Sequence, residues 1–231
     1  SYIPPSAWAW RKGRAKDCAA LADEIVAIFP HELPPYEKAG AHISFVGNPL
    51  IDTVHAEMPL ADARRHFGII EGDVPILLLP GSRREEIERL LPAMLAAAKI
   101  LHAQDPARRF FLPVAGSVLK ERVQEIIASS GMTVTLTYDA RYALMGIARA
   151  AMAASGTVVM EAAIMGLPAV VLYRMSALSY FVGRLLVDVP RFSLPNILLG
   201  ETFETELLQD EVQPERIAEA MERILADGAA R

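Results

Sequence analysis

The chain has 231 residues, of which 52% are hydrophobic and 22% charged, and this composition indicates a globular protein with a sizeable core. Its formal net charge of −5 gives no support to nucleic-acid binding, and the single cysteine, Cys18, excludes an internal disulfide. No apolar run approaches the roughly 18 residues of a transmembrane helix, so we expect none. Because residues 1–5 carry neither a Met nor a signal sequence, we expect a fragment of a longer protein.

The first part of the chain has the pattern of one β-α-β unit. Residues 23–29 form a short apolar run that stops at Pro30, as a buried parallel strand would. Residues 32–39 are compatible with a helix that has two prolines in its first turn, and a second strand is expected at 43–46. The sequence Gly-Asn-Pro at 47–49 then breaks the pattern. A mixed, polar stretch with a short helix near 62–67 follows, and we expect a domain boundary there.

A longer series of alternating strands and helices follows this boundary. We expect strands at 76–79, 110–114, 133–136, 150–153 and 169–172, and helices at 84–103, 117–128, 141–148, 158–165 and 214–226. Gly166 is expected to end one of these helices in a left-handed conformation. Alternation at this spacing predicts an α/β fold with a doubly wound parallel sheet and helices on both faces.

Two turns of small residues stand between an expected strand and an expected helix. One is Gly81-Ser82-Arg83 and the other is Ser155-Gly156-Thr157. Ligands of parallel sheets bind at the carboxyl ends of the strands, where N–H groups at helix N-termini attract anions. The two turns therefore indicate a site that holds a diphosphate between them. Glu161 follows one helical turn later, where its carboxylate could accept hydrogen bonds from a ribose.

Each of these candidate residues also has a simpler interpretation, which the local pattern leaves open. Arg83 could be a solvated arginine of an ordinary β-α turn, because neither a Walker-type lysine nor a Gly-x-Gly pattern is present. A buried Glu161 needs a partner, and Arg174 or Arg141 could supply it in place of a ligand. Asn196 could contact a sugar, but its chemistry alone favours a turn residue.

Other polar and aromatic residues give weaker signals. Trp8 and Trp10 alternate beside basic residues and could line a sugar or acyl site, but packing under a loop is the favoured interpretation. The five histidines have no metal-ligand spacing, and Cys18 has no histidine nearby in the sequence. We therefore expect neither a metal site nor a Cys–His nucleophile, and no cofactor.

Six motifs occur in the order found in lipid-A-disaccharide synthases, and the chain resembles that family over essentially its whole length. They are residues 5–11 (Pro-Ser-Ala-Trp-Ala-Trp-Arg), 45–50 (Phe-Val-Gly-Asn-Pro-Leu), 79–83 (Leu-Pro-Gly-Ser-Arg) with Glu86 and Ile87, 154–157 (Ala-Ser-Gly-Thr) with Glu161, 173–175 (Tyr-Arg-Met), and 193–196 (Ser-Leu-Pro-Asn). Each motif alone is weak, but their combination is specific.

The resemblance implies an inverting glycosyltransferase of the two-Rossmann-domain (GT-B) type. Such enzymes move 2,3-diacylglucosamine from UDP to 2,3-diacylglucosamine 1-phosphate (lipid X), forming the β-1,6 disaccharide of lipid A. By this resemblance, residues 1–55 are the remnant of an acceptor-binding domain, 56–71 a linker, 72–187 the donor-binding domain, and 188–231 a crossover segment with a C-terminal helix. The general base would be an aspartate upstream of residue 1, so the fragment alone would be inactive.

The resemblance also assigns roles to individual residues. Arg83 and Asn196 become catalytic candidates, with Arg83 countering charge on the departing UDP. The UDP-binding residues would be Gly81, Ser82, Arg83, Ser155, Gly156, Thr157, Glu161, Tyr173 and Arg174.

The sequence departs from the family pattern at two informative positions. Asn48 stands where the family usually has His, and Asp188 stands where a Lys is expected. Gly-Asn-Pro also occurs in related nucleotide-sugar enzymes, so a UDP-N-acetylglucosamine 2-epimerase remains an alternative. A non-catalytic nucleotide-binding module is a second alternative.

The expected partners are the two acylated sugar substrates and no nucleic acid, in a cytoplasmic protein. Peripheral association with the inner membrane and formation of a homo-oligomer are left open.

Overall fold

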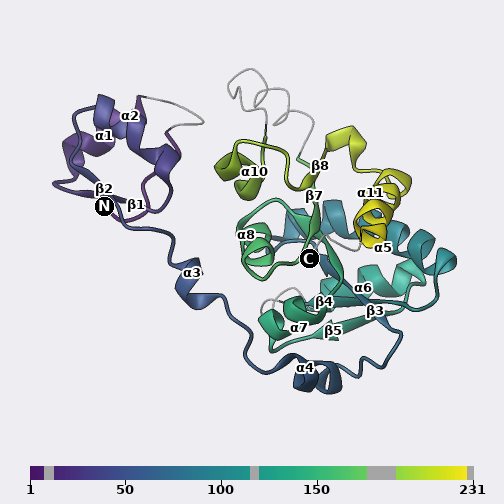
Figure 1. The fold of residues 1–231 in the computed structure, drawn as a ribbon. Coiled ribbons are helices and arrows are strands. Elements are labelled where there is room, and N and C mark those ends of the chain that lie inside the picture. The colour runs from purple at the N-terminus through teal and green to yellow at the C-terminus, as the bar shows by residue number, and fades with distance from the viewer. Residues whose placement is uncertain (8–12, 115–119, 176–190, 228–231) are drawn as a thin grey trace. The chain divides into compact units, whose positions relative to one another are not determined.

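The computed structural model describes residues 1–7, 13–114, 120–175 and 191–227, which form two compact units (Figure 1). Residues 1–53 belong to the first unit, and residues 54–175 and 191–227 belong to the second. Residues 8–11 of the aromatic motif, the end of the expected donor-binding domain and Asp188 lie outside the described residues.

The first unit contains the expected β-α-β arrangement. Its elements are α1 (Arg14–Leu21), β1 (Ile25–Ala27), the 3-10 helix η1 (Pro30–Glu32), α2 (Leu33–Lys38), β2 (Ile43–Phe45) and α3 (Leu50–Thr53). Strands β1 and β2 are parallel, with Ile25 paired to Ile43. Tyr36 of α2 is fully buried beside Ile25, and its hydroxyl donates a 2.7 Å hydrogen bond to the Pro5 carbonyl.

The second unit is built on a six-stranded sheet in the order β5-β4-β3-β6-β7-β8. All of its strand pairs are parallel, which confirms the expected fold class. The strands are β3 (Val74–Leu79), β4 (Arg108–Pro113), β5 (Val134–Thr137), β6 (Ala150–Ala154), β7 (Ala169–Tyr173) and β8 (Thr205–Leu208). The helices are α4 (Leu60–His66), α5 (Arg84–Gln104), α6 (Lys120–Ser130), α7 (Arg141–Ile147), α8 (Thr157–Ile164), α10 (Leu194–Leu199) and α11 (Pro214–Ala226), and a 3-10 helix, η2 (Gln209–Glu211), precedes α11.

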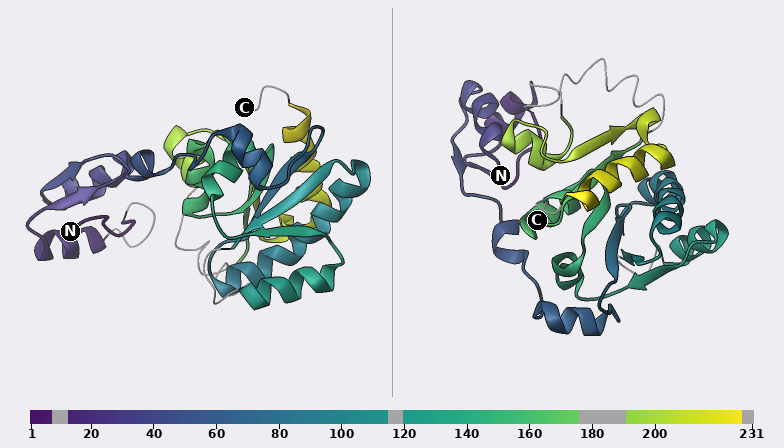
Figure 2. Two further views of the ribbon diagram at one scale, coloured as in Figure 1. Left: turned by 90° about the horizontal axis from the view of Figure 1, so that it is seen from below. Right: turned by 45° about the vertical axis from the view of Figure 1, so that its right-hand side comes forward.

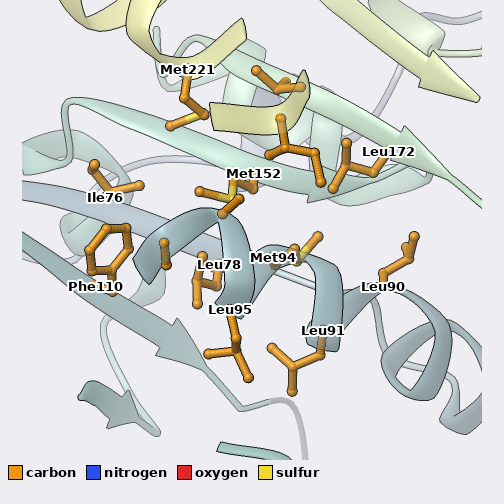
Figure 3. Packing of buried hydrophobic residues seen from close by; sticks show 14 of the residues in the cluster. Ile76, Leu78, Leu90, Leu91, Met94, Leu95, Phe110, Met152, Leu172 and Met221 are labelled. Atoms are coloured by element: carbon orange, nitrogen blue, oxygen red, sulfur yellow. The ribbon is translucent and has the colours of Figure 1, made fainter. Parts of the chain in front are cut away.

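Side chains alternate between the two faces of this sheet, as the period of two in a strand requires. On one face, Ile76 and Leu78 of β3 pack with Phe110, Met152 and the helices α5, α6 and α11 (Figure 3). On the other face, Leu77 and Leu79 pack with the helices α4, α7 and α8. Figures 1 and 2 show the sheet of this unit with helices on both sides. The central strands are therefore buried on both faces, as in doubly wound folds.

Most of the expected strands and helices begin and end within a few residues of the observed ones. Gly166 has a φ of +66° after α8, which confirms the left-handed helix end. Strand β8 was not expected, because its sequence, Thr-Glu-Leu-Leu, has only one β-branched residue and no longer apolar run. Residues 193–196 were interpreted from chemistry as a turn, but Ser193 is the N-cap of α10 and Leu194–Leu199 are helical, with Pro195 in the first turn where its missing N–H is not needed.

The stretch that we expected to be a linker contributes to the core of the second unit. Ala63 of α4 is fully buried, and Phe67 and Ile69 pack in the same cluster as α7. Helix α4 lies against α7. This packing fixes residues 60–69 on the sheet unit.

We predict that Leu91→Ala lowers the free energy of unfolding by about 2–5 kcal/mol, because Leu91 is fully buried between α5 and the sheet and its truncation leaves a cavity. Denaturant unfolding of the two variants would measure this. Ile70→Ala is the control, since the Ile70 side chain is 69% exposed. Equal effects of the two substitutions would contradict the assignment of this core.

Candidate functional site

A cleft of about 630 Å³ opens at the carboxyl ends of the strands β3 to β6. Both turns singled out in the sequence line it, together with Glu161 on α8. The structure therefore brings together seven of the predicted residues: Gly81, Ser82, Arg83, Ser155, Gly156, Thr157 and Glu161. The segment 137–141, from the end of β5 to the start of α7, forms a further part of the wall. This location is where parallel sheets bind ligands.

The turn after β3 requires glycine at position 81. Gly81 has a φ of +97°, and a Cβ at this position would overlap Oε2 of Glu86. The positive φ disfavours any residue with a Cβ, and a Cβ would also displace the carboxylate of Glu86. The turn therefore has one fixed shape before helix α5 begins.

The first N–H groups of this turn already hold an anion, which is the carboxylate of Glu86. Its Oε2 accepts hydrogen bonds from the backbone N–H groups of Ser82 and Arg83, both at 3.3 Å. Its Oε1 accepts a 2.9 Å hydrogen bond from Nη1 of Arg83. Glu86 is the third residue of α5 after its N-cap, Arg83, whereas the usual Ser-x-x-Glu signature would have selected Ser82 and Glu85, so the structure was needed to identify this contact.

The turn after β6 is tied to neighbouring strands. The Ser155 N–H donates to the Leu172 carbonyl at 2.9 Å, and its hydroxyl donates to the Phe192 carbonyl at 3.2 Å. Gly156 is the N-cap of α8, and nothing lies within 4 Å of the position that a Cβ would take there. The N-terminus of α8 thus faces open space in the cleft.

Glu161 is buried at 6% exposure and is paired with a cation of the cleft wall. Its Oε1 accepts from Nη2 of Arg141 at 3.0 Å and from the hydroxyl of Tyr142 at 3.3 Å. The Arg141 guanidinium also lies over the Tyr142 ring, 4.6 Å from its centroid. Of the two partners considered for Glu161, Arg141 is therefore the one found. Oε2 has no hydrogen-bond partner among the described residues.

Burial of the Arg141 guanidinium acts to lower its pKa. The hydrogen bond with Tyr142 and the negative charges of Glu161 and Glu57 outweigh this effect and raise the pKa. Arg141 is thus a fixed positive charge at the cleft.

Glu57 is a cleft residue that sequence reasoning missed. Its carboxylate accepts hydrogen bonds from the N–H groups of Tyr142 at 3.3 Å and Ala143 at 2.7 Å, in the first turn of α7. It thereby satisfies N–H groups that a helix leaves unpaired. No local pattern could reveal this contact, because Glu57 and α7 are far apart in the sequence.

Three predicted residues do not line the cleft. Tyr173, at the end of β7, is half-buried against Phe192, with ring centroids 5.7 Å apart. Burial and then the charge of Glu86 raise the pKa of Tyr173. Arg174 is exposed. Asn196 is fully buried, and its amide is used entirely within the protein.

The Asn196 amide joins the start of α10 to the segment that leads into β8. Its Nδ2 donates to the Glu204 carbonyl and to Oε1 of Glu206, both at 2.8 Å. Its Oδ1 accepts from the N–H groups of Phe203 at 2.8 Å and Glu204 at 2.7 Å. These four bonds exhaust the capacity of an amide side chain. In this structure the amide binds only protein groups, and a catalytic role for Asn196 stays a prediction.

Glu206 of β8 completes this network, and sequence reasoning missed it as well. Its carboxylate accepts from the N–H groups of Phe192 at 3.1 Å and Ser193 at 2.9 Å, besides Asn196. The Phe192 carbonyl in turn accepts the hydroxyl of Ser155. Glu206 therefore holds the segment against which the second cleft turn is fixed.

Glu204 is a buried carboxyl with incomplete hydrogen bonding. Its Oε2 accepts a 2.8 Å hydrogen bond from the Ala169 N–H, while Oε1 is buried without a partner among the described residues. Burial raises the pKa of Glu204 to about 7, against the opposing effect of the Ala169 hydrogen bond.

Within the described ranges, no group of three or more His, Cys, Asp or Glu side chains is arranged to hold a metal ion. In the same part of the chain, no helix has the length and apolar character needed to cross a membrane.

The whole chain, residues 1–231, matches a family model described as lipid-A-disaccharide synthetase. A lipid-A-disaccharide synthase of Geobacter metallireducens is 43% identical over 226 residues, covering 98% of this chain and 59% of that protein. One from Myxococcus xanthus is 40% identical over 230 residues, covering 100% of this chain and 60% of that protein. The chain thus spans less than two thirds of the length of these relatives.

Solved structures share the fold at low sequence identity. UDP-GlcNAc 2-epimerase from Neisseria meningitidis, bound to UDP-GlcNAc, has a TM-score of 0.65 at 15% identity, covering 92% of this chain and 56% of that chain. WaaG, a glycosyltransferase involved in lipopolysaccharide biosynthesis, has a TM-score of 0.52 at 13% identity, covering 90% and 55%. These likenesses establish the α/β fold of such glycosyltransferases and epimerases, and the fold alone.

We predict that stability falls as the pH rises through the window between the ordinary pKa of glutamate, 4.5, and about 7, because the folded state holds the Glu204 proton more tightly than the unfolded state does. The contribution is fully present below 4.5 and is lost above about 7. It amounts to at most roughly 3 kcal/mol.

Glu204→Gln mimics the protonated side chain, so its free energy of unfolding should lose this part of the pH dependence. Urea unfolding at pH 5 and pH 8 would measure the difference. Glu201→Gln, at an exposed glutamate of the same loop, is the control and should follow the parent protein. Parallel pH profiles for Glu204→Gln and the parent would refute the assignment.

Proposed function

This chain belongs to the lipid-A-disaccharide synthetase family, and we propose that it supplies the UDP-binding part of an inverting glycosyltransferase. In the proposed reaction, 2,3-diacylglucosamine moves from UDP to the 6-hydroxyl of lipid X, and the products are the β-1,6 disaccharide 1-phosphate and UDP. The general base and most of the acceptor surface are proposed to belong to the part of the relatives that this chain does not cover.

One observation carries this proposal, namely the meeting of both small-residue turns and Glu161 in a single cleft at the strand ends. The cleft is large enough for a nucleotide, since small-molecule pockets range over about 300–1,000 Å³. Its wall combines backbone N–H groups at two helix starts with the cations Arg83 and Arg141. This combination is suited to a nucleoside diphosphate.

Within this proposal, different cleft residues bind different parts of the nucleotide. Glu161 receives the ribose, because its Oε2 is available while Oε1 is held by Arg141. The turns after β3 and β6 receive the diphosphate. The Arg83 side chain is 84% exposed, so it can move toward the charge that develops on the departing UDP.

The residues outside the cleft support it. Asn196 and Glu206 hold Phe192, whose carbonyl accepts the Ser155 hydroxyl. Tyr173 is the last residue of β7, the neighbour of β6 in the sheet, and Arg174 follows it. Both stay predictions as UDP contacts. The same holds for membrane association, for a homo-oligomer and for the domain roles of 1–55, 72–187 and 188–231.

A UDP-N-acetylglucosamine 2-epimerase activity is the second candidate, because solved epimerases share the fold. Assays of the full-length protein with both substrate sets decide between them. Release of UDP with formation of a disaccharide 1-phosphate supports the synthase, and epimerised sugar without transfer refutes it. UDP binding without either reaction would indicate a non-catalytic nucleotide-binding module.

We predict that Glu161→Ala weakens UDP binding by roughly 1–3 kcal/mol, the range for lost hydrogen bonds to a charged group. Calorimetry should compare UDP with 2′,3′-dideoxy-UDP, which lacks the ribose hydroxyls. The parent protein should prefer UDP, and the variant should bind both ligands equally. If a folded Glu161→Ala still prefers UDP as strongly as the parent, Glu161 does not contact the ribose.

We predict that Arg83→Ala lowers kcat of the full-length enzyme by about 10²–10³-fold, the loss typical when one group that stabilises transition-state charge is removed. Arg84→Ala is the matched control. Arg84 is exposed, pairs with Glu88 at 3.0 Å and does not line the cleft. Near-normal kcat/KM for Arg83→Ala, or an equal loss in both variants, would remove Arg83 from the reaction.

A further inference from the structure

The carboxylate of Glu86 occupies the position where the cleft offers its donors to an anion. It accepts three hydrogen bonds, from the N–H groups of Ser82 and Arg83 and from the Arg83 guanidinium. Its side chain is 29% exposed and lines the cleft. These are the backbone groups that the small-residue turn would otherwise present to a phosphate.

The turn leaves space for this carboxylate. A Cβ on Gly81 would overlap Oε2 of Glu86, so the glycine makes room for the chain's own anion. The backbone N–H groups of Ser82 and Arg83 each carry one hydrogen, which is already donated to Glu86, and the charge of the carboxylate would repel a phosphate placed beside it. A phosphate that binds there must displace the carboxylate.

We propose that Glu86 is a built-in competitor for the donor diphosphate. This inference rests on the proposed function of the cleft. In the empty cleft, Glu86 neutralises Arg83 and keeps the turn in its binding shape. When a diphosphate enters, Glu86 leaves the N–H groups and Arg83 changes partner from the carboxylate to the phosphate. Glu86 thereby lowers the affinity for UDP and favours its release after transfer.

If Glu86 competes with phosphate for these hydrogen bonds, its substitution should change the affinity only for ligands that carry phosphate groups. Glu86→Gln keeps an acceptor oxygen for the turn but removes the charge. We expect this variant to bind UDP and inorganic pyrophosphate about tenfold more tightly than the parent, which corresponds to about 1.4 kcal/mol. Its affinity for uridine should not change, because uridine has no phosphate.

The matched control is Glu85→Gln, which removes the same charge one residue away. Glu85 is 82% exposed, pairs with Arg89 at 3.4 Å and does not line the cleft. A general gain for anions from the lower negative charge would appear equally in both variants. Only a gain specific to Glu86→Gln supports the competitor role.

The experiment is calorimetry of the parent, Glu86→Gln and Glu85→Gln with UDP, uridine and pyrophosphate. Unchanged or weaker binding of UDP and pyrophosphate by Glu86→Gln, relative to Glu85→Gln, overturns the inference. If the parent binds no UDP, the proposed function fails, while the pyrophosphate titrations still decide the role of Glu86. Should Glu86→Gln not fold, Glu86→Asp, whose shorter side chain withdraws the charge from the turn, should show a smaller gain of the same kind.

Discussion

The parallel pairing of β3 with β6 is the constraint on which the site depends. The two strands are remote in sequence, yet Leu79 pairs with Ala153 at their carboxyl ends. The turns that follow the two strands therefore lie side by side at the same edge of the sheet. Strand β6 consists of alanines around a single methionine, so helices can pack closely on both of its faces. The cleft is the space that this register leaves above the two strand ends.

Three glutamate side chains accept hydrogen bonds from backbone N–H groups at or just before the starts of helices, and these contacts also organise the site. Glu57 satisfies the first N–H groups of α7, Glu86 those at the start of α5, and Glu206 those before α10. Each fixes an N-terminus that a helix cannot satisfy by itself. The site is thus shaped by internal anions before any substrate arrives, and its remaining cations and N–H groups define what it can receive.

The sequence was most informative where structure follows from neighbouring residues. The apolar runs of the strands, the amphipathic face of α5 and the glycines at 81 and 166 each carry their conformation locally, and the two turns were correctly placed in one cleft. The partners of Glu57 and Glu206 were not predictable, because these carboxylates meet N–H groups brought close only by the fold. The hydrogen-bond partners of Asn196 could not be predicted for the same reason, since an amide can bind a sugar or a buried network of protein groups.

The hydrogen bonding of Asn196 also sets how much chemical change its position tolerates. The amide nitrogen donates two hydrogen bonds and the amide oxygen accepts two. The position therefore needs one donor atom and one acceptor atom in this orientation. An aspartate there would have the same shape, but an acceptor oxygen would face the Glu206 carboxylate and the Glu204 carbonyl in place of the donated hydrogens. A difference of one atom would convert two attractions into repulsions. An aspartate at this position would therefore loosen the segment beside the second cleft turn, although its side chain would fill the same space.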